Sequence, residues 1–277
     1  MEIKASDVKA LRDKTGAGMM ECKKALVDSN GDPAAAEKLL KEKGLAAVAK
    51  RSDRAAGEGR IFVKQDGNRI AIVEMTCETD FVAKNDDFIA LGEKLVSITL
   101  EKNYTEVAQE HKDLMQELAI KIRENMEVRR VALVTIPENA VASTYVHHNF
   151  KIGAVVVVKG STDEKVAHFA HECCLHLAVN NPSYITKEEF PQDYVAEQEE
   201  IFKRQIADDP KMAGKSENVL EGILKGKVNK HLAEICFMDQ MYIDDEKKSV
   251  ATVLAETGKA VGAELEFGQI ILYVLGK

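Results

Sequence analysis

The fold of this chain is decided at one stretch, Met75-Thr76-Cys77-Glu78-Thr79-Asp80-Phe81-Val82-Ala83-Lys84-Asn85-Asp86-Asp87-Phe88. Before it, residues 60–75 alternate in the manner of a β-hairpin around an Asp66-Gly67-Asn68 turn. After it, apolar residues recur at steps of three and four, at Phe88, Leu91, Leu95 and Ile98. The stretch therefore predicts a junction between a strand and a helix that continues to about residue 100.

Asp80 and Phe81 lie at this junction and belong to neither flanking pattern. A phenylalanine in such a place either packs into the local core or stands out as a wedge for a partner, and periodicity alone favours the core. An aspartate there can simply cap the start of the helix. The residues by themselves leave these alternatives open.

Composition restricts the class of protein. The 277 residues are 45% hydrophobic and 30% charged, which is typical of a globular protein with a sizeable core. The net charge of −8 gives no overall basic surface, so we expect no direct nucleic-acid partner. No apolar run approaches the ~20 residues of a membrane span, so we expect no membrane partner. Five cysteines at irregular spacing, and an N-terminus without a secretory pattern, predict a reducing, cytoplasmic location.

The succession of patterns predicts an α+β fold in several parts. Three short helices form a small N-terminal domain, a polar linker follows, and strand–turn–helix units recur after about 80 residues, which indicates two related core subdomains. Two polar helices around a loop predict an antiparallel hairpin that protrudes from the second subdomain. The predicted boundaries are 1–50 for the helical domain, 51–59 for the linker, 60–139 and 140–277 for the core subdomains, and about 187–232 for the hairpin.

Single residues predict where several helices begin and end. Gly44 is expected to end the third helix, and Thr105 to cap the helix that carries His111 on its packed face. The Thr257-Gly258 pair is expected to end the helix near the C-terminus.

Two neighbouring methionines begin the second predicted helix. Met19 falls on the apolar stripe of Cys22, Ala25 and Leu26, whereas Met20 lies beside that stripe. Both cannot point inward on one helix, so one of them is expected to be exposed, as suits a partner surface.

The sequence offers little chemistry of its own. On a helix, Cys173 and Cys174 lie about 100° apart, so we expect no metal site with His171 and His176, and no disulfide. The chain contains no phosphate-binding Gly-x-x-x-x-Gly-Lys-Ser/Thr loop and no Gly-x-Gly-x-x-Gly fingerprint. We therefore expect no cofactor and no bound nucleotide of its own.

Two motifs carry a resemblance to a known family. Residues 79–85 and residues 11–26 resemble the two signatures of bacterial elongation factor Ts, and the similarity extends over nearly the whole chain. The resemblance implies a ubiquitin-associated-like fold for the N-terminal domain. It also implies an exchange factor, not an enzyme, that binds the GTPase elongation factor Tu and promotes release of its GDP by disturbing the Mg²⁺ and phosphate site.

The resemblance also assigns residues to the partner contact. Near the partner's Mg²⁺ it implies Thr79, Asp80, Phe81 and Val82, with Phe81 as a wedge. Elsewhere on the partner it implies a further set: Arg12, Met19, Met20 and Lys23 from the helical domain, and Asn125 and His147 from the core.

A rival function is a binding module, such as a chaperone or scaffold, that has no exchange activity. An enzyme is a third and weaker reading, because no nucleophile geometry is visible. Whether the hairpin mediates a homodimer of the complex with elongation factor Tu stays open.

Overall fold

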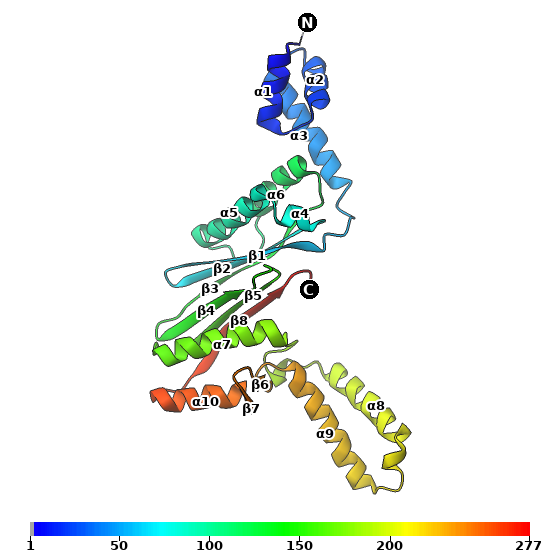
Figure 1. Cartoon of the computed structure of the whole chain (residues 1–277), viewed down its shortest axis with the longest axis vertical. Helices are drawn as coiled ribbons and strands as arrows, with labels where there is room; N and C mark the ends of the chain where they lie inside the picture. Colours follow the sequence, from blue (N-terminus) through cyan, green and yellow to red (C-terminus); the bar gives the residue numbers. More distant parts are fainter. Residues whose placement is uncertain (1–2) are drawn as a thin grey trace. The chain divides into compact units, whose positions relative to one another are not determined.

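The computed structural model describes residues 3–277 and has an α+β fold (Figure 1). The chain divides into two compact units. Unit 1 contains the residues up to Thr135 together with Val146–Gly153 and Tyr273–Lys277, and unit 2 contains Ile136–Tyr145 and Ala154–Leu272. The finer division into a helical domain, a linker and two subdomains stays a prediction.

Unit 1 begins with three helices around a small core of their own. They are α1 (Ala5–Thr15), α2 (Met19–Asp28) and α3 (Pro33–Ala49). The buried side chains recur at helical spacing, and they are Val8, Leu11, Cys22, Ala25, Leu26 and Ala36. Asp32 caps α3 by accepting hydrogen bonds from the backbone N–H groups of Ala34 and Ala35.

The prediction that Gly44 ends the third helix is wrong. Helix α3 continues through it to Ala49. A Cβ at position 44 would lie 2.6 Å from Ile120 of helix α6 (Gln109–Ile122), so this glycine permits close packing of two helices.

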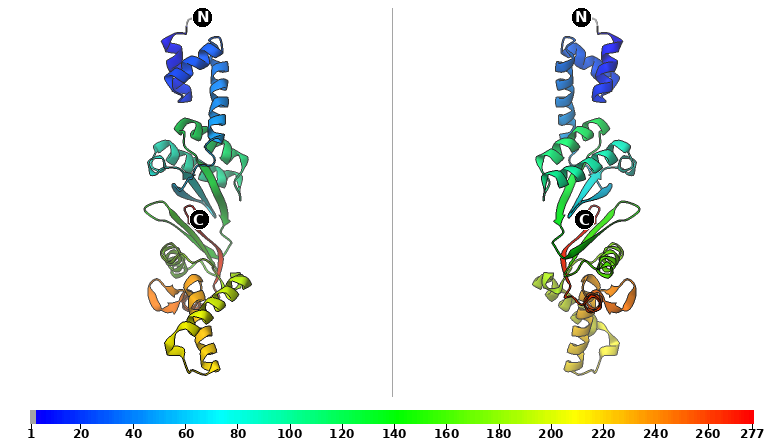
Figure 2. Two further views of the ribbon diagram at one scale, coloured as in Figure 1. Left: turned by 90° about the vertical axis from the view of Figure 1, so that its right-hand side faces the viewer. Right: turned by 90° about the vertical axis from the view of Figure 1, so that its left-hand side faces the viewer.

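An antiparallel sheet with the order β1-β2-β3 follows in unit 1. Its strands are β1 (Glu58–Asp66), β2 (Arg69–Cys77) and β3 (Glu127–Thr135). Helix α5 (Asp86–Lys102) and α6 pack on one face of the sheet, as Figures 1 and 2 show. The first two strands meet at Gly67-Asn68, as the turn pattern predicted.

Helix α6 begins at Gln109, and the prediction that Thr105 caps it is wrong. The backbone N–H of Ala108 donates instead to Nδ1 of His111, at 3.0 Å. The His111 ring is fully buried, as predicted, and its Nε2 lies 3.0 Å from Oγ1 of Thr99. Since the Thr99 hydroxyl donates to the Leu95 carbonyl, His111 is held as the neutral tautomer with its proton on Nε2.

A second three-stranded sheet, with the order β4-β5-β8, belongs mostly to unit 2. Its strands are β4 (Ala140–Val146), β5 (Ile152–Lys159) and β8 (Glu266–Val274). The sheet packs with helices α7 (Glu164–Asn180) and α10 (Val250–Val261) around a common core. Cys173 and Cys174 are buried in this core as free thiols, and burial raises the pKa of both.

The predicted end of the last helix is also wrong. Helix α10 continues past Gly258 to Val261, and Gly262, at φ 68°, forms its left-handed cap. Gly258 is buried, and a Cβ there would lie 2.7 Å from the carbonyl oxygen of Ala263. A short hairpin of β6 (Met241–Tyr242) and β7 (Asp245–Ser249), which the sequence patterns did not predict, precedes α10.

Helices α8 (Gln192–Asp208) and α9 (Glu217–Ile235) lie side by side and form a helical hairpin (Figures 1 and 2). The hydroxyl of Tyr194 lies 2.9 Å from Nε2 of His231 across the pair. None of the helices in residues 3–277 combines the length and the apolar character needed to cross a membrane.

Glu74 of β2 is a fully buried carboxylate in unit 1. It accepts hydrogen bonds from Arg129 at 3.2 Å, from Arg130 at 2.5 Å and from the backbone N–H of Gly276 at 2.9 Å. A β-bulge opposite Glu74 and Met75 lets two consecutive arginines reach one carboxylate. The same arginines donate to the carbonyls of Lys277 and Val274, so this carboxylate anchors the C-terminal segment on β2 and β3.

Glu74→Ala is expected to lower the free energy of unfolding by about 2–4 kcal/mol, because two arginines and a backbone N–H lose their acceptor. Glu117→Ala is the control, since Glu117 is 61% exposed and pairs with Lys41 at 3.6 Å; it is expected to cost less than about 1 kcal/mol. Urea unfolding measures both, and equal losses would contradict the anchoring role.

Stability is expected to fall in mild acid because His111 and His176 are buried. Burial lowers the pKa of both below the ordinary value of 6.5. The unfolded chain therefore binds more protons below about pH 6.5, and the free energy of unfolding decreases as the pH falls from there through the lowered folded pKa values. His111→Gln should flatten this dependence in urea unfolding, whereas His168→Gln, at a side chain that is 70% exposed, should leave it unchanged.

Candidate functional site: the Asp80–Phe81 turn

The junction between β2 and α5 contains a helix of a single turn, α4 (Asp80–Ala83). Thr79 is its N-cap, and its hydroxyl oxygen accepts a hydrogen bond from the backbone N–H of Val82 at 3.4 Å. Asn85 then caps α5 by accepting from the N–H of Asp87 at 2.9 Å. Two caps within a few residues fix the chain direction on both sides of α4.

Phe81 is exposed, with 81% of its surface accessible to solvent, which excludes the interpretation that it packs into the local core. Successive residues of a helix point about 100° apart, so Phe81 and Ala83 face nearly opposite directions. Ala83 is buried in the core of unit 1, and Val82 packs partly against that core. Burying the far side of this single turn therefore turns the phenylalanine outward.

Asp80 lies beside Phe81 with half of its side chain exposed. It is the first residue of α4 and not its cap, a role that Thr79 takes. The Asp80 carboxylate accepts a hydrogen bond from Nζ of Lys84 at 2.6 Å, and this bond lowers the pKa of Asp80. A negative charge thus stands next to the exposed ring.

Glu124 is the residue of this site that the sequence patterns missed. Its carboxylate accepts hydrogen bonds from the backbone N–H groups of Glu78 and Thr79, each at 3.1 Å, and from the Thr79 hydroxyl at 2.7 Å. It follows the left-handed C-cap of α6 and belongs to no periodic pattern. No signal in the sequence connects it to a turn 45 residues earlier.

Asn125 and His147 also lie in unit 1. The Asn125 side chain donates to the carbonyls of Ser52 and Arg54, at 3.2 and 2.6 Å, so its amide already ties residues 52–54 to the segment that follows α6. His147 is half-buried, and its ring centroid lies 4.0 Å from that of the exposed His148, with the two rings tilted by 46°.

The four site residues predicted in the N-terminal helices all have exposed side chains. They are Arg12 on α1 and Met19, Met20 and Lys23 on α2. Met19 is 47% exposed and Met20 74%, so the prediction that Met19 belongs to the buried stripe is wrong. Both methionines precede Lys23 by one helical turn, and the three therefore share a face of α2.

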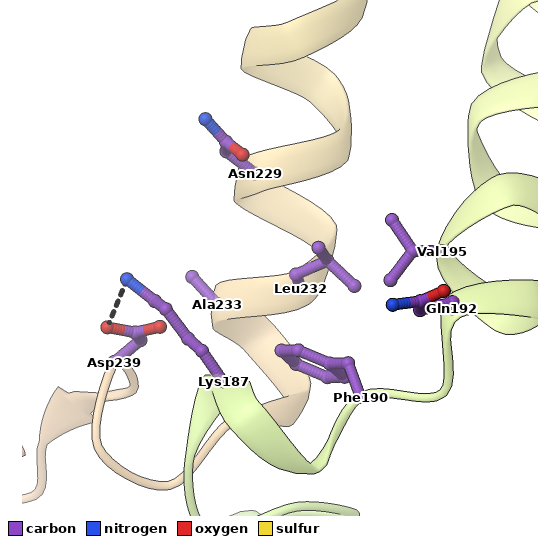
Figure 3. Close-up of a pocket in the computed structure, with 8 residues that line it drawn as sticks. All are labelled: Lys187, Phe190, Gln192, Val195, Asn229, Leu232, Ala233 and Asp239. Carbon is purple, nitrogen blue, oxygen red and sulfur yellow. Dashed lines mark ion pairs between the residues drawn. The ribbon is translucent and has the colours of Figure 1, made fainter.

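A cavity of about 660 Å³ lies at the base of the helical hairpin in unit 2 (Figure 3). Lys187 and Asp239 form an ion pair at 3.0 Å at one side, and Phe190, Val195 and Leu232 supply apolar surface. The eight lining residues include no serine, cysteine or histidine, so they assemble no nucleophile and base. Within residues 3–277, no group of three or more His, Cys, Asp or Glu side chains is placed to hold a metal ion.

Comparison with known proteins points to one family. The family model described as elongation factor Ts matches residues 78–277. Elongation factor Ts of Treponema denticola is 49% identical over 281 residues, which cover 100% of this chain and 99% of that protein. The Borrelia duttonii protein of the same name is 39% identical over 96% of this chain and 96% of that protein. Elongation factor Ts of Clostridium botulinum is 35% identical, over 99% of this chain and 93% of that protein.

Phe81→Ala is expected to change the free energy of unfolding by no more than about 0.5 kcal/mol, because the ring is exposed. Phe88→Ala, seven positions later on α5, is the matched comparison, since that ring is fully buried and its loss should cost about 3–5 kcal/mol. Urea unfolding of both variants tests the contrast. A large loss with Phe81→Ala would mean that its ring packs on the protein in solution.

Proposed function

Since this chain belongs to the elongation factor Ts family of translation elongation factors, we propose that it is the guanine nucleotide exchange factor of elongation factor Tu. In this role it binds the GDP form of that GTPase and promotes GDP release, after which GTP binds. It is then not an enzyme with a substrate of its own, but a protein that changes the affinity of a partner for a nucleotide.

The physical requirement for exchange is differential binding. A GTPase holds its nucleotide through Mg²⁺ and through backbone amides around the phosphates. A factor that binds the GDP-bound and nucleotide-free states equally tightly shifts nothing. The exchange factor must therefore insert groups that fit only once the Mg²⁺ and phosphate site is disturbed. By linkage, GDP weakens the binding of the exchange factor by the same ratio by which the exchange factor weakens the binding of GDP.

The observation that carries the proposal is the exposed Phe81 on a firmly capped turn. Its ring is the most exposed of the large hydrophobic side chains in residues 3–277. An aromatic side chain held out of the protein in this way suits insertion between elements of a partner. The adjacent Asp80 supplies a carboxylate that would compete for, or repel, the groups around the metal, while Thr79 and Val82 flank the pair.

A second contact is proposed for the N-terminal helices. Met19 and Met20 offer a flexible apolar surface, and Arg12 and Lys23 add positive charge beside it. Asn125 and His147 are proposed as further contacts from unit 1. Because the Asn125 amide already binds the linker carbonyls, its contribution to the partner would come through the position of the backbone around it.

The proposed function is tested by GDP release from elongation factor Tu loaded with a fluorescent GDP. The unaltered chain should accelerate release, and Phe81→Ala and Asp80→Ala should each reduce that acceleration by about tenfold or more, as expected for a residue central to an interface. Val179→Ala, at an exposed apolar residue of unit 2, is the control and should not change the rate. Tight binding of the unaltered chain without faster release would favour the rival binding module.

A further inference from the structure

We propose that Glu124 is a positioning residue for exchange, which fixes the Asp80–Phe81 turn in the orientation that the partner requires. This inference rests on the proposed function. Glu124 acts on the backbone immediately before α4, where its carboxylate accepts from the N–H groups of Glu78 and Thr79. The argument starts from the weakness of that helix.

Helix α4 has only four residues, far fewer than the ~12–15 that a helix needs to be even marginally stable in water. Its exposed member, Phe81, gains nothing from burial in unit 1. Burial of Ala83 and Val82 directs the far side of the turn toward the core, and contacts at its ends have to supply the rest of its orientation. At the N-terminal end those contacts converge on the Glu124 carboxylate.

Thr79 passes the constraint from Glu124 into the helix. Its hydroxyl donates to Oε1 of Glu124 at 2.7 Å, and the same oxygen accepts from the N–H of Val82 at 3.4 Å. Donation to Glu124 fixes the Thr79 rotamer in which the hydroxyl can cap α4. Oε2 of Glu124 meanwhile takes the backbone N–H groups of Glu78 and Thr79, so the carboxylate holds both the cap residue and the one before it.

The contact is reciprocal. Glu78 accepts a hydrogen bond from the backbone N–H of Asn125 at 2.6 Å, while Glu124 accepts from the N–H of Glu78 at 3.1 Å. Arg54 lies 3.4 Å from the Glu78 carboxylate and compensates one of the two negative charges. Segments 78–79 and 124–125 are thus joined through two carboxylates, which resists rotation of either segment more than a single bond would.

The residue before Glu124 connects the same segment to the N-terminal helices. Arg123 adopts a left-handed conformation, at φ 71°, and its guanidinium pairs with Glu21 at 2.5 Å. Glu21 also accepts from the N–H of Gly18, the residue before Met19, and this bond together with Arg123 lowers the pKa of Glu21. The two surfaces proposed to meet the partner are therefore anchored on adjacent residues, Arg123 and Glu124.

The consequence for exchange is preorganisation. A wedge that is already oriented loses less conformational entropy when it inserts, so more of the binding free energy is available to disturb the partner's nucleotide site. A purely structural role would instead lower stability and exchange together.

The first experiment needs no partner and uses the absence of tryptophan from this sequence. Phe81→Trp introduces a single reporter, and its time-resolved fluorescence anisotropy measures how freely the side chain at position 81 moves. Glu124→Ala should lower the residual anisotropy clearly. Glu124→Gln should largely restore it, because the amide oxygen can accept the two backbone N–H groups and the amide nitrogen can donate to Thr79. Glu127→Gln, the same change at an exposed residue of β3, should have no effect.

The second experiment measures GDP release from elongation factor Tu at increasing concentrations of each variant with Phe81 intact. Glu124→Ala should lower the rate at saturation by about tenfold or more, as expected when a positioned group is displaced by about 1 Å. The half-saturating concentration should change less, because the surface of the N-terminal helices is untouched. Glu124→Gln should keep the rate within about threefold of the unaltered chain, and Glu127→Gln should match it.

The outcomes separate this inference from the function on which it rests. If the unaltered chain does not accelerate release, the proposed function fails, and the anisotropy alone decides whether Glu124 holds the turn. Unchanged anisotropy in a folded Glu124→Ala variant, or an unchanged rate at saturation, would overturn the positioning role. Should Glu124→Ala fail to fold by circular dichroism, Glu124→Asp takes its place, since a carboxylate one methylene shorter cannot reach all three donors.

Discussion

The hydrogen bonds between Glu124 and residues 78–79 are the constraint on which the site depends. Strand β2 and helix α5 would form without them, because both have apolar faces to bury. The single turn between the two elements has no such face on the Phe81 side. A partly buried carboxylate that accepts three hydrogen bonds supplies the missing order, and charge-assisted bonds of this kind are about twice as strong as neutral ones.

A second carboxylate has a comparable role in unit 1. Glu74 gathers Arg129, Arg130 and the backbone of the C-terminal segment, although a buried ion network of this kind is not in itself strong evidence for stability. Its effect is specificity: the segment that ends the chain can satisfy these groups in one register only. In both places a carboxylate from one strand or loop fixes a segment distant in sequence, at a position where apolar packing gives no unique answer.

The exposed groups of the proposed function fit this arrangement. Phe81, Met19 and Met20 are exposed while the backbone beside each is anchored, on Glu124 or through Glu21 and Arg123. Exposing apolar side chains costs a protein solubility, and it is useful where a partner covers them. The buried cysteines and the buried, neutral His111 complete the cores around these positions.

The sequence by itself determined most of the elements and their order, apart from the short β6–β7 hairpin, because burial of an apolar face imposes a period of 3.6 or of 2 on the residues. The Asp66-Gly67-Asn68 turn, the cap at Asp32 and the buried α7 helix with Cys173 and Cys174 follow from such local rules. Only the tertiary structure decided that Gly44 and Gly258 lie inside helices and do not end them. Gly44 is required by the close approach of Ile120 on another helix, and Gly258 by the close approach of the Ala263 backbone just beyond its own helix. It also decided the direction of Phe81 and the partners of Glu124, since a hydrogen bond across 45 residues leaves no periodic trace in the chain.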